Sequence, residues 1–179
     1  MAKKTAGQKA PTADNKIYTF ITGTPIGKIQ AAASNKALIG LWFIGQKYFP
    51  CGTEAWISDP DYPVFVSLKA WLEDYFAKKK PKIKIPLSPQ GSEFQQAVWK
   101  LLLEIPSGKT STYGAIAAKL ASTGKKASAQ AVGGAVGHNP ISLLIPCHRV
   151  LGSDGSLTGY AGGLDKKPAL LELEGEKTS

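Results

Sequence analysis

The chain of 179 residues has few of the residues that build disulfide scaffolds and metal sites. It contains two cysteines, two histidines and a single arginine, Arg149. Two scattered cysteines do not make a disulfide framework, and with two histidines they give no ordinary zinc-ligand spacing. We therefore expect no metal site, and a protein of the reducing cytoplasm.

Long apolar stretches are also missing. No run approaches the roughly 20 apolar residues that a membrane helix needs. The first five residues, MAKKT, carry no apolar segment of the length that a signal peptide needs, so we expect neither a secretory signal nor a membrane partner. The hydrophobic fraction of 43% is typical of globular proteins, and the length suits one large or two small domains.

Acidic residues are scarce in the middle of the chain. Residues 75–150 hold eleven basic residues against Glu93 and Glu104, while basic and acidic residues balance in the rest. All of the formal charge of +9 therefore belongs to the middle segment, which favours a nucleic-acid partner. Five of these charges lie in residues 78–84 and fit a solvated, lysine-rich linker equally well.

The first half of the chain has the pattern of a small α/β domain. Residues 1–15 are polar and aperiodic, and we expect a disordered tail. Short strands are predicted over 17–22, 28–33 and 37–44, followed by an amphipathic helix over 62–79, within a domain covering 16–80. The lysine- and proline-rich residues 81–91 form the expected linker.

Residues 92–179 have the pattern of a second, mainly helical domain. Ser92 and Gln95 match a capping box that begins a helix, and Pro106-Ser107-Gly108 ends it. Helices over 113–121 and 127–136, joined by a turn at 122–125, predict a helix-turn-helix, although an αα-corner in a helical core has the same spacing. The last helix is built of small residues, which allow close approach to DNA or tight helix packing.

One of the two cysteines lies in the hexapeptide Ile145-Pro-Cys-His-Arg-Val150. Cationic neighbours lower the pKa of a cysteine and favour its nucleophilic thiolate, so Cys147 is a candidate nucleophile. A buried structural cysteine is the alternative, and Arg149 fits a structural tie as well as thiolate stabilisation. Cys51 has no partner in the sequence, and we interpret it as structural.

Several further motifs occur in order around this hexapeptide. They are Phe94-Gln95-x-x-Val98-Trp99, Ile105-Pro106-x-Gly108-x-x-x-x-Tyr113, residues 131–135 (AVGGA), Asn139-Pro140, residues 159–164 (GYAGGL) and residues 170–175 (LLELEG). Over roughly 92–175 the chain resembles the methylated-DNA–protein-cysteine methyltransferases, the O6-alkylguanine-DNA alkyltransferase family. The resemblance implies an α+β fold, with a small N-terminal α/β domain that has a ribonuclease-H-like sheet, and a mainly helical, winged-helix-like C-terminal domain with a helix-turn-helix.

The resemblance also implies direct damage reversal in DNA repair. Cys147 would accept the alkyl group of O6-alkylguanine irreversibly, in a single turnover and without a cofactor. His148 would take the thiol proton through a water, and Glu174 would orient His148, as in hydrolytic triads. Tyr113 would donate a proton to the leaving guanine. The alternative interpretation gives neither residue a catalytic role: Glu174 would be a surface carboxylate at a helix end, and Tyr113 would pack at a helix start.

Substrate-binding roles follow from the same resemblance. Backbone carbonyls of Cys147 and Val150 would accept from the guanine amine, Tyr160 and Ala161 would line the pocket, and Asn139 would tie the helix to the Cys147 loop. The base would be flipped out of double-stranded DNA by a helix in the minor groove. The expected DNA contacts are Ala129, Gln130, Ala131, Gly133 and Gly134.

Gln130 departs from the family pattern, which commonly has an arginine there. An amide cannot reproduce the stacking of a guanidinium, so we expect weaker DNA contact at this position. His138 is interpreted as an exposed helix-end residue, and the protein as a monomer. The alternatives are a non-catalytic lesion-binding relative and a helix-turn-helix regulator; a cysteine hydrolase has less support, because nothing outside the hexapeptide suggests an acyl pocket.

Overall fold

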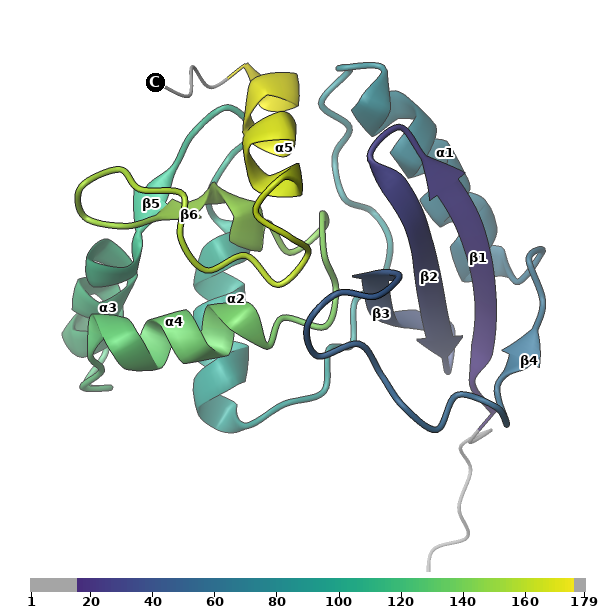
Figure 1. Ribbon diagram of the computed structural model, residues 1–179. Helices are drawn as coiled ribbons and strands as arrows, with labels where there is room; N and C mark the ends of the chain where they lie inside the picture. The colour runs from purple at the N-terminus through teal and green to yellow at the C-terminus, as the bar shows by residue number, and fades with distance from the viewer. Residues whose placement is uncertain (1–15, 176–179) are drawn as a thin grey trace, which may run out of the picture.

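The computed structural model describes residues 16–175, so the tail expected over 1–15 lies outside the described residues. The N-terminal half contains a four-stranded sheet in the order β3-β2-β1-β4 (Figure 1). Its strands are β1 (Tyr18–Thr24), β2 (Gly27–Ser34), β3 (Ala37–Phe43) and β4 (Ile57–Ser58). The three antiparallel strands β1–β3 agree with the prediction. The sequence analysis missed β4, since its two exposed residues carry no alternating pattern.

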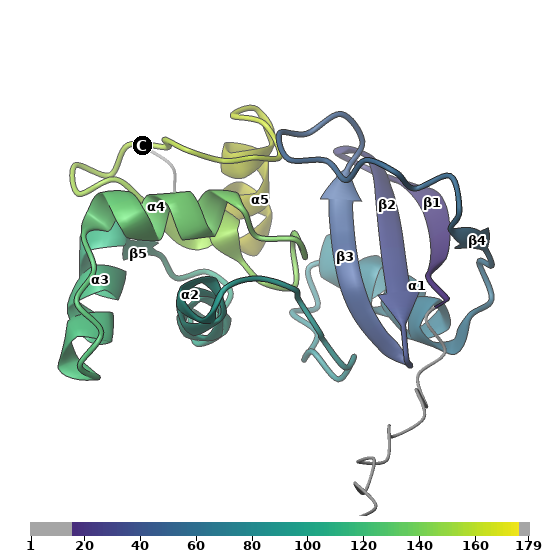
Figure 2. The same ribbon diagram turned by 90° about the horizontal axis from the view of Figure 1, so that it is seen from below.

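Helix α1 (Pro63–Phe76) covers one face of this sheet (Figure 2). Its buried side chains, Val64, Phe65, Leu68, Trp71, Leu72 and Tyr75, lie on one side of the helix. Pro63 occupies the first turn, where proline needs no hydrogen-bond donor. The helix ends three residues before the predicted Lys79, because Ala77 caps it and Lys78 has a φ of 62° in the left-handed region.

The C-terminal half is mainly helical, and the predicted α+β class is confirmed. Its helices are α2 (Glu93–Leu103), α3 (Tyr113–Ser122), α4 (Ala129–Gly137) and α5 (Lys166–Glu174), with the 3-10 turn η1 (Cys147–Arg149) and the parallel pair β5 (Ser111–Thr112) and β6 (Val150–Leu151). The capping box of Ser92 and Gln95 is confirmed. Helix α4 begins two residues later than predicted, because the Ser128 hydroxyl caps it. No helix in residues 16–175 has the length and apolarity needed to cross a membrane.

The edge of β3 connects the two halves of the molecule. Leu38 exchanges backbone hydrogen bonds of 2.8 Å with Pro86 and Ser88, so the expected linker is held along the sheet. Leu41 makes the same type of contact, also at 2.8 Å, with Pro140 and Ser142. The segment that leads into Cys147 is thereby anchored to the N-terminal sheet, and one hydrophobic cluster runs through both halves.

Candidate active site

Cys147 is buried at the start of η1, with 5% of its surface exposed. The Asn139 side chain donates from Nδ2 to Cys147 Sγ at 3.1 Å and to the Ile145 carbonyl at 2.8 Å. Asn139 Oδ1 accepts from the Ile141 amide at 3.0 Å. This amide therefore connects the segment after α4 to the cysteine loop and places one donor on the sulfur.

The expectation that neighbouring cations hold Cys147 as a thiolate is wrong for this resting state. Burial raises the pKa of the Cys147 thiol, and the Asn139 hydrogen bond and the charge of Lys167 lower it by less. Arg149, the cation adjacent in sequence, directs its guanidinium to Glu174 instead. Cys147 therefore rests as a thiol and needs a base before it can act as a nucleophile.

His148 has the properties of that base. It is fully buried, and its Nε2 lies 2.8 Å from Glu174 Oε1. An ionised carboxylate only accepts hydrogen bonds, so Nε2 carries the proton and Nδ1 has a free lone pair. Burial lowers the pKa of His148 more than Glu174 raises it, which favours the neutral ring. Nδ1 makes no hydrogen bond with any other described group.

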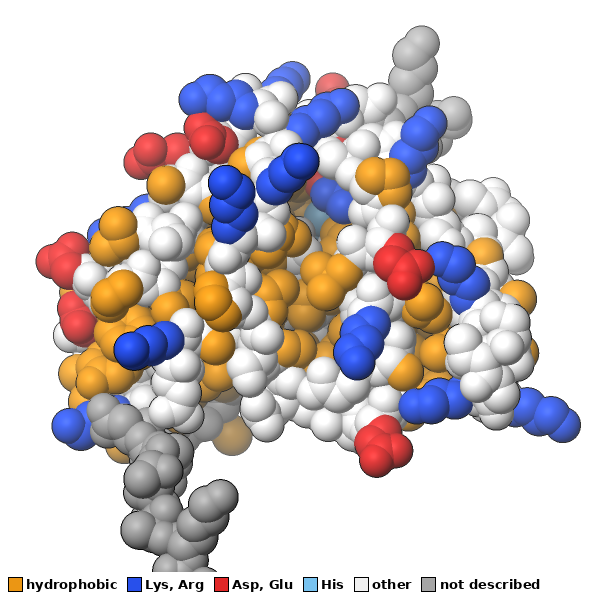
Figure 3. Space-filling view, turned by 180° about the vertical axis from the view of Figure 1, so that it is seen from behind, with side chains coloured by type: hydrophobic (Ala, Val, Ile, Leu, Met, Phe, Trp, Pro, Cys, Tyr) orange, Lys and Arg blue, Asp and Glu red, His pale blue; other side chains and the backbone are white. Residues whose placement is uncertain are grey.

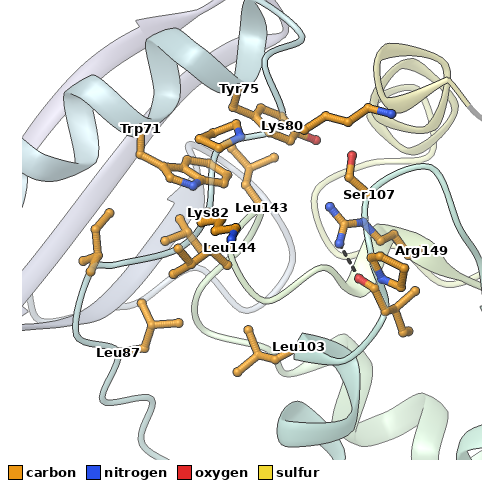
Figure 4. Close-up of a pocket in the computed structure, with 15 residues that line it drawn as sticks. Trp71, Tyr75, Lys80, Lys82, Leu87, Leu103, Ser107, Leu143, Leu144 and Arg149 are labelled. Atoms are coloured by element: carbon orange, nitrogen blue, oxygen red, sulfur yellow. Dashed lines mark hydrogen bonds between the residues drawn. The ribbon is translucent and has the colours of Figure 1, made fainter.

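Glu174, at the end of α5, is the centre of a buried polar cluster. Arg149 donates to both carboxylate oxygens, from Nε and Nη2, each at 2.8 Å, and from Nη1 to the Ile105 carbonyl (Figure 4). Burial opposes ionisation of Glu174, yet hydrogen bonds from His148 and Arg149 hold the pKa of its carboxyl well below the usual range. Of its two candidate roles, stabilising the thiolate or connecting parts of the fold, Arg149 has the second: it connects the cysteine loop to Glu174 and Ile105.

The sequence analysis missed two residues of this site. Tyr75, on α1, donates its hydroxyl to Glu174 Oε1 at 2.7 Å; its place on the apolar face of an amphipathic helix indicates only that it is buried. Lys167 is fully buried and donates from Nζ to the carbonyls of Val150 and Thr158, at 2.5 and 2.9 Å. Burial lowers the pKa of Lys167 to about 8, against the attraction of Cys147.

Tyr160 and Ala161, the expected pocket residues, line a cavity of about 420 Å³. Gly133 and Gly134 of α4 line the same cavity, as do Lys47 and Tyr48 from the N-terminal half, which the sequence did not indicate. Two other expected residues, Tyr113 and Val150, are not among its lining residues. Tyr113, half-buried, donates to the Thr158 carbonyl at 3.0 Å, and the buried Val150 presents its carbonyl to Lys167.

Several of the residues expected to contact DNA lie on the outer face of helix α4. Ala129, Gln130 and Ala131 are exposed and do not line the cavity. A Cβ added at Gly134 would meet no atom within 4 Å, and one at Gly133 would meet only the Tyr113 ring at 3.8 Å, an ordinary contact. Packing within the protein therefore does not require either glycine, which favours close approach to an external surface.

Two residues named from the sequence, His138 and Cys51, lie outside this site. His138 is exposed at the end of α4, as expected, and its ring stacks on Tyr48 with centroids 3.9 Å apart. Cys51 is exposed and free, so its interpretation as a structural cysteine is wrong.

Fold and site together define a two-part protein with a helix-turn-helix and a buried cysteine beside a histidine–glutamate pair. Two family models match the chain: the DNA binding domain of 6-O-methylguanine DNA methyltransferase at residues 93–176, and its ribonuclease-like domain at residues 16–89. The chain belongs to this family, which confirms the resemblance found in the sequence.

Individual relatives agree with this assignment. The methylated-DNA–protein-cysteine methyltransferase of Methanosarcina barkeri is 45% identical over 88% of this chain and 97% of its own length. That of Mycobacterium bovis is 44% identical over 84% of this chain and 88% of its own length. The crystal structure of Mycobacterium tuberculosis OGT in complex with DNA superposes with a TM-score of 0.79, at 41% identity, over 88% of this chain and 92% of that one.

Proposed function

We propose that this protein repairs DNA by moving the methyl group of O6-methylguanine onto its own Cys147. The supporting observation is the buried cluster in which Asn139 contacts the sulfur and Glu174 holds His148 in the tautomer with a free Nδ1, within a chain of this family. A soft thiolate suits displacement at a saturated carbon. The transfer needs no cofactor, because the methyl group comes from the substrate and stays on the protein.

The reaction balances as a single displacement. His148 Nδ1 takes the proton of Cys147; no hydrogen bond joins the two side chains among the described residues, so the proton passes by way of water. The sulfur forms a bond to the methyl carbon as the bond from that carbon to O6 breaks. Tyr113 supplies a proton to the departing guanine and regains one from water, while His148 releases the thiol proton to water. Asn139 stabilises the charge that develops on sulfur.

The substrate reaches Cys147 through the cavity between α4 and residues 159–164. Gln130 and the small residues Ala129, Ala131, Gly133 and Gly134 contact the minor groove, and the modified base turns out of the duplex into the cavity. Tyr160 and Ala161 form its wall, and the Val150 carbonyl has a second lone pair for the guanine amine. Because the substrate is DNA, we propose that the protein acts in the cytoplasm with access to the chromosome, or in the nucleus of a eukaryotic cell.

Intact-mass spectrometry after incubation with duplex oligonucleotide carrying O6-methylguanine tests this proposal. We expect one methyl group per protein molecule, no gain in Cys147→Ser, and an unchanged gain in the control Cys51→Ser. Turnover beyond one equivalent would contradict the single-use mechanism. Binding to the damaged duplex without any mass gain would support a lesion-binding relative, and equal binding to intact duplex would support a regulator.

A further inference from the structure

The cluster around Glu174 receives one side chain from the N-terminal half of the molecule. Among the hydrogen bonds of residues 16–175, Tyr75 alone connects α1 to this carboxylate, across 99 positions of sequence. Tyr75 also lines a groove of about 740 Å³ between the two halves, opposite Arg149 (Figure 4). Apolar side chains gather where the halves meet on the back of the molecule (Figure 3).

The Tyr75 ring is fixed before any substrate binds. It is 5% exposed, stacks on Trp71 with centroids 4.9 Å apart at 13°, and meets the Phe76 ring edge-on at 5.2 Å. Burial, together with the adjacent Glu174 charge, raises the pKa of Tyr75 far above its usual value. The hydroxyl therefore stays protonated at neutral pH and remains a hydrogen-bond donor.

The Tyr75 hydroxyl and His148 Nε2 share a single oxygen, Glu174 Oε1, at 2.7 and 2.8 Å. The tyrosine therefore fixes the position of the same oxygen that holds the imidazole. Arg149 contacts Oε1 as well, in the bidentate pair. Each donor withdraws negative charge from the oxygen, which limits how strongly Glu174 attracts a proton onto His148.

We propose that Tyr75 is a positioning residue for methyl transfer, through which the N-terminal half aligns Glu174 and sets the basicity of His148. This inference rests on the proposed roles of Cys147, His148 and Glu174. It gives the N-terminal half a part in the chemistry, by way of the Glu174 carboxylate.

Tyr75→Phe is the direct test, because it keeps the ring and removes only the hydroxyl. We expect the single-turnover rate at saturating damaged duplex to fall about 10-fold, the size of one hydrogen bond to a charged group, with unchanged DNA affinity. Without the tyrosine donor Glu174 attracts the His148 proton more strongly, so the pKa of His148 rises. The acidic limb of the rate profile should then move upward by about half a pH unit.

Other charged or titratable groups face this pair and stay the same in the variant. They are Arg149, Lys167, Cys147 and Tyr160. Tyr62→Phe is the matched control, because its hydroxyl accepts from the Lys36 amide at 3.1 Å within the N-terminal half. It should leave both the rate and the pH profile unchanged.

Glu174→Gln distinguishes a failure of the proposed catalytic roles of His148 and Glu174 from a failure of the proposed positioning role of Tyr75. If Glu174→Gln does not slow the transfer, the proposed roles of His148 and Glu174 fail. If it does, but Tyr75→Phe keeps the wild-type rate and pH profile, only the inference about Tyr75 fails. A thermal melt of each variant excludes unfolding, and adding Tyr75→Phe to Glu174→Gln should have little further effect, because the two side chains act as one unit.

Discussion

Replacing Arg149 by methionine tests whether the buried Glu174 cluster stabilises the fold. The Glu174 side chain is 2% exposed, and Arg149 supplies the formal positive charge that pairs with it at 2.8 Å. Removing one partner of a buried ion pair costs about 3–5 kcal/mol. Tyr75 and His148 still donate to the carboxylate, so we expect the lower end, about 3 kcal/mol. For a chain of this length that corresponds to a melting temperature about 9 °C lower.

The size of this loss should depend on pH. The pKa of Glu174 is depressed in the folded protein, so its contribution is complete above the unfolded value of about 4.3 and is lost as the pH falls through the lower, folded value. In Arg149→Met burial prevails and the pKa of Glu174 rises, so a neutral carboxylic acid forms more readily. The difference between wild type and variant should therefore be largest near neutral pH and shrink on acidification.

Thermal melts of both proteins at several pH values provide the measurement. Lys119→Met is the control, because it removes an ion pair with Glu104 at 2.7 Å whose side chains are 61% and 56% exposed. Such a surface pair contributes only about 0–1 kcal/mol. Two results would refute the reasoning. One is a melting temperature for Arg149→Met as high as that of Lys119→Met, and the other is a difference in melting temperature between wild type and Arg149→Met that stays constant with pH.

Three other substitutions test the DNA surface and the buried lysine. Gln130→Arg should tighten binding to damaged duplex in a fluorescence anisotropy titration, and unchanged or weaker binding would refute our view of this position. Gly134→Ala should raise the melting temperature, because alanine favours a helix by about 1 kcal/mol and its Cβ meets no atom, yet it should weaken DNA binding; equal affinity would argue against groove contact. Lys167→Met should slow methyl transfer, since the Lys167 charge lowers the pKa of Cys147. The difference in rate between wild type and Lys167→Met should narrow above pH 8, where wild-type Lys167 loses its charge. A ratio of the two rates that stays constant with pH would count against a role of Lys167 in lowering the pKa of Cys147.

Local patterns predicted most of the elements in this fold. The strands β1–β3 and the capping box at Ser92 are indicated by residues close together in the sequence, and both agree with the structure. The boundaries of α1 and α4 were less accurate, because a single cap or one left-handed residue moves an end by two or three positions. The two-residue strand β4 depends entirely on pairing with β1, which no local pattern encodes.

The sequence predicted only part of the candidate site, because Tyr75 and Lys167 contact groups that lie far from them in the sequence. Tyr75 lies on the apolar stripe of α1, so its spacing predicts burial without naming a partner 99 residues away. From the sequence alone, Lys167 is predicted to be solvent-exposed, since lysines are almost never fully buried unless paired. Its partners are two backbone carbonyls that come together only in the folded chain.

The ionisation of Cys147 shows most clearly that a residue adjacent in the sequence need not interact with the reactive group. Arg149 is two residues away, yet its guanidinium binds Glu174 and leaves the sulfur to Asn139 and to the more distant charge of Lys167. Burial then outweighs both and keeps the thiol protonated. Activation must therefore come from proton transfer to His148, whose tautomer depends on Glu174, and Glu174 is held by residues from both halves of the molecule. On this reasoning, the reactivity of the cysteine is a property of the assembled chain, and a variant that loosens the contact between the halves should slow methyl transfer even when every side chain near the sulfur is intact.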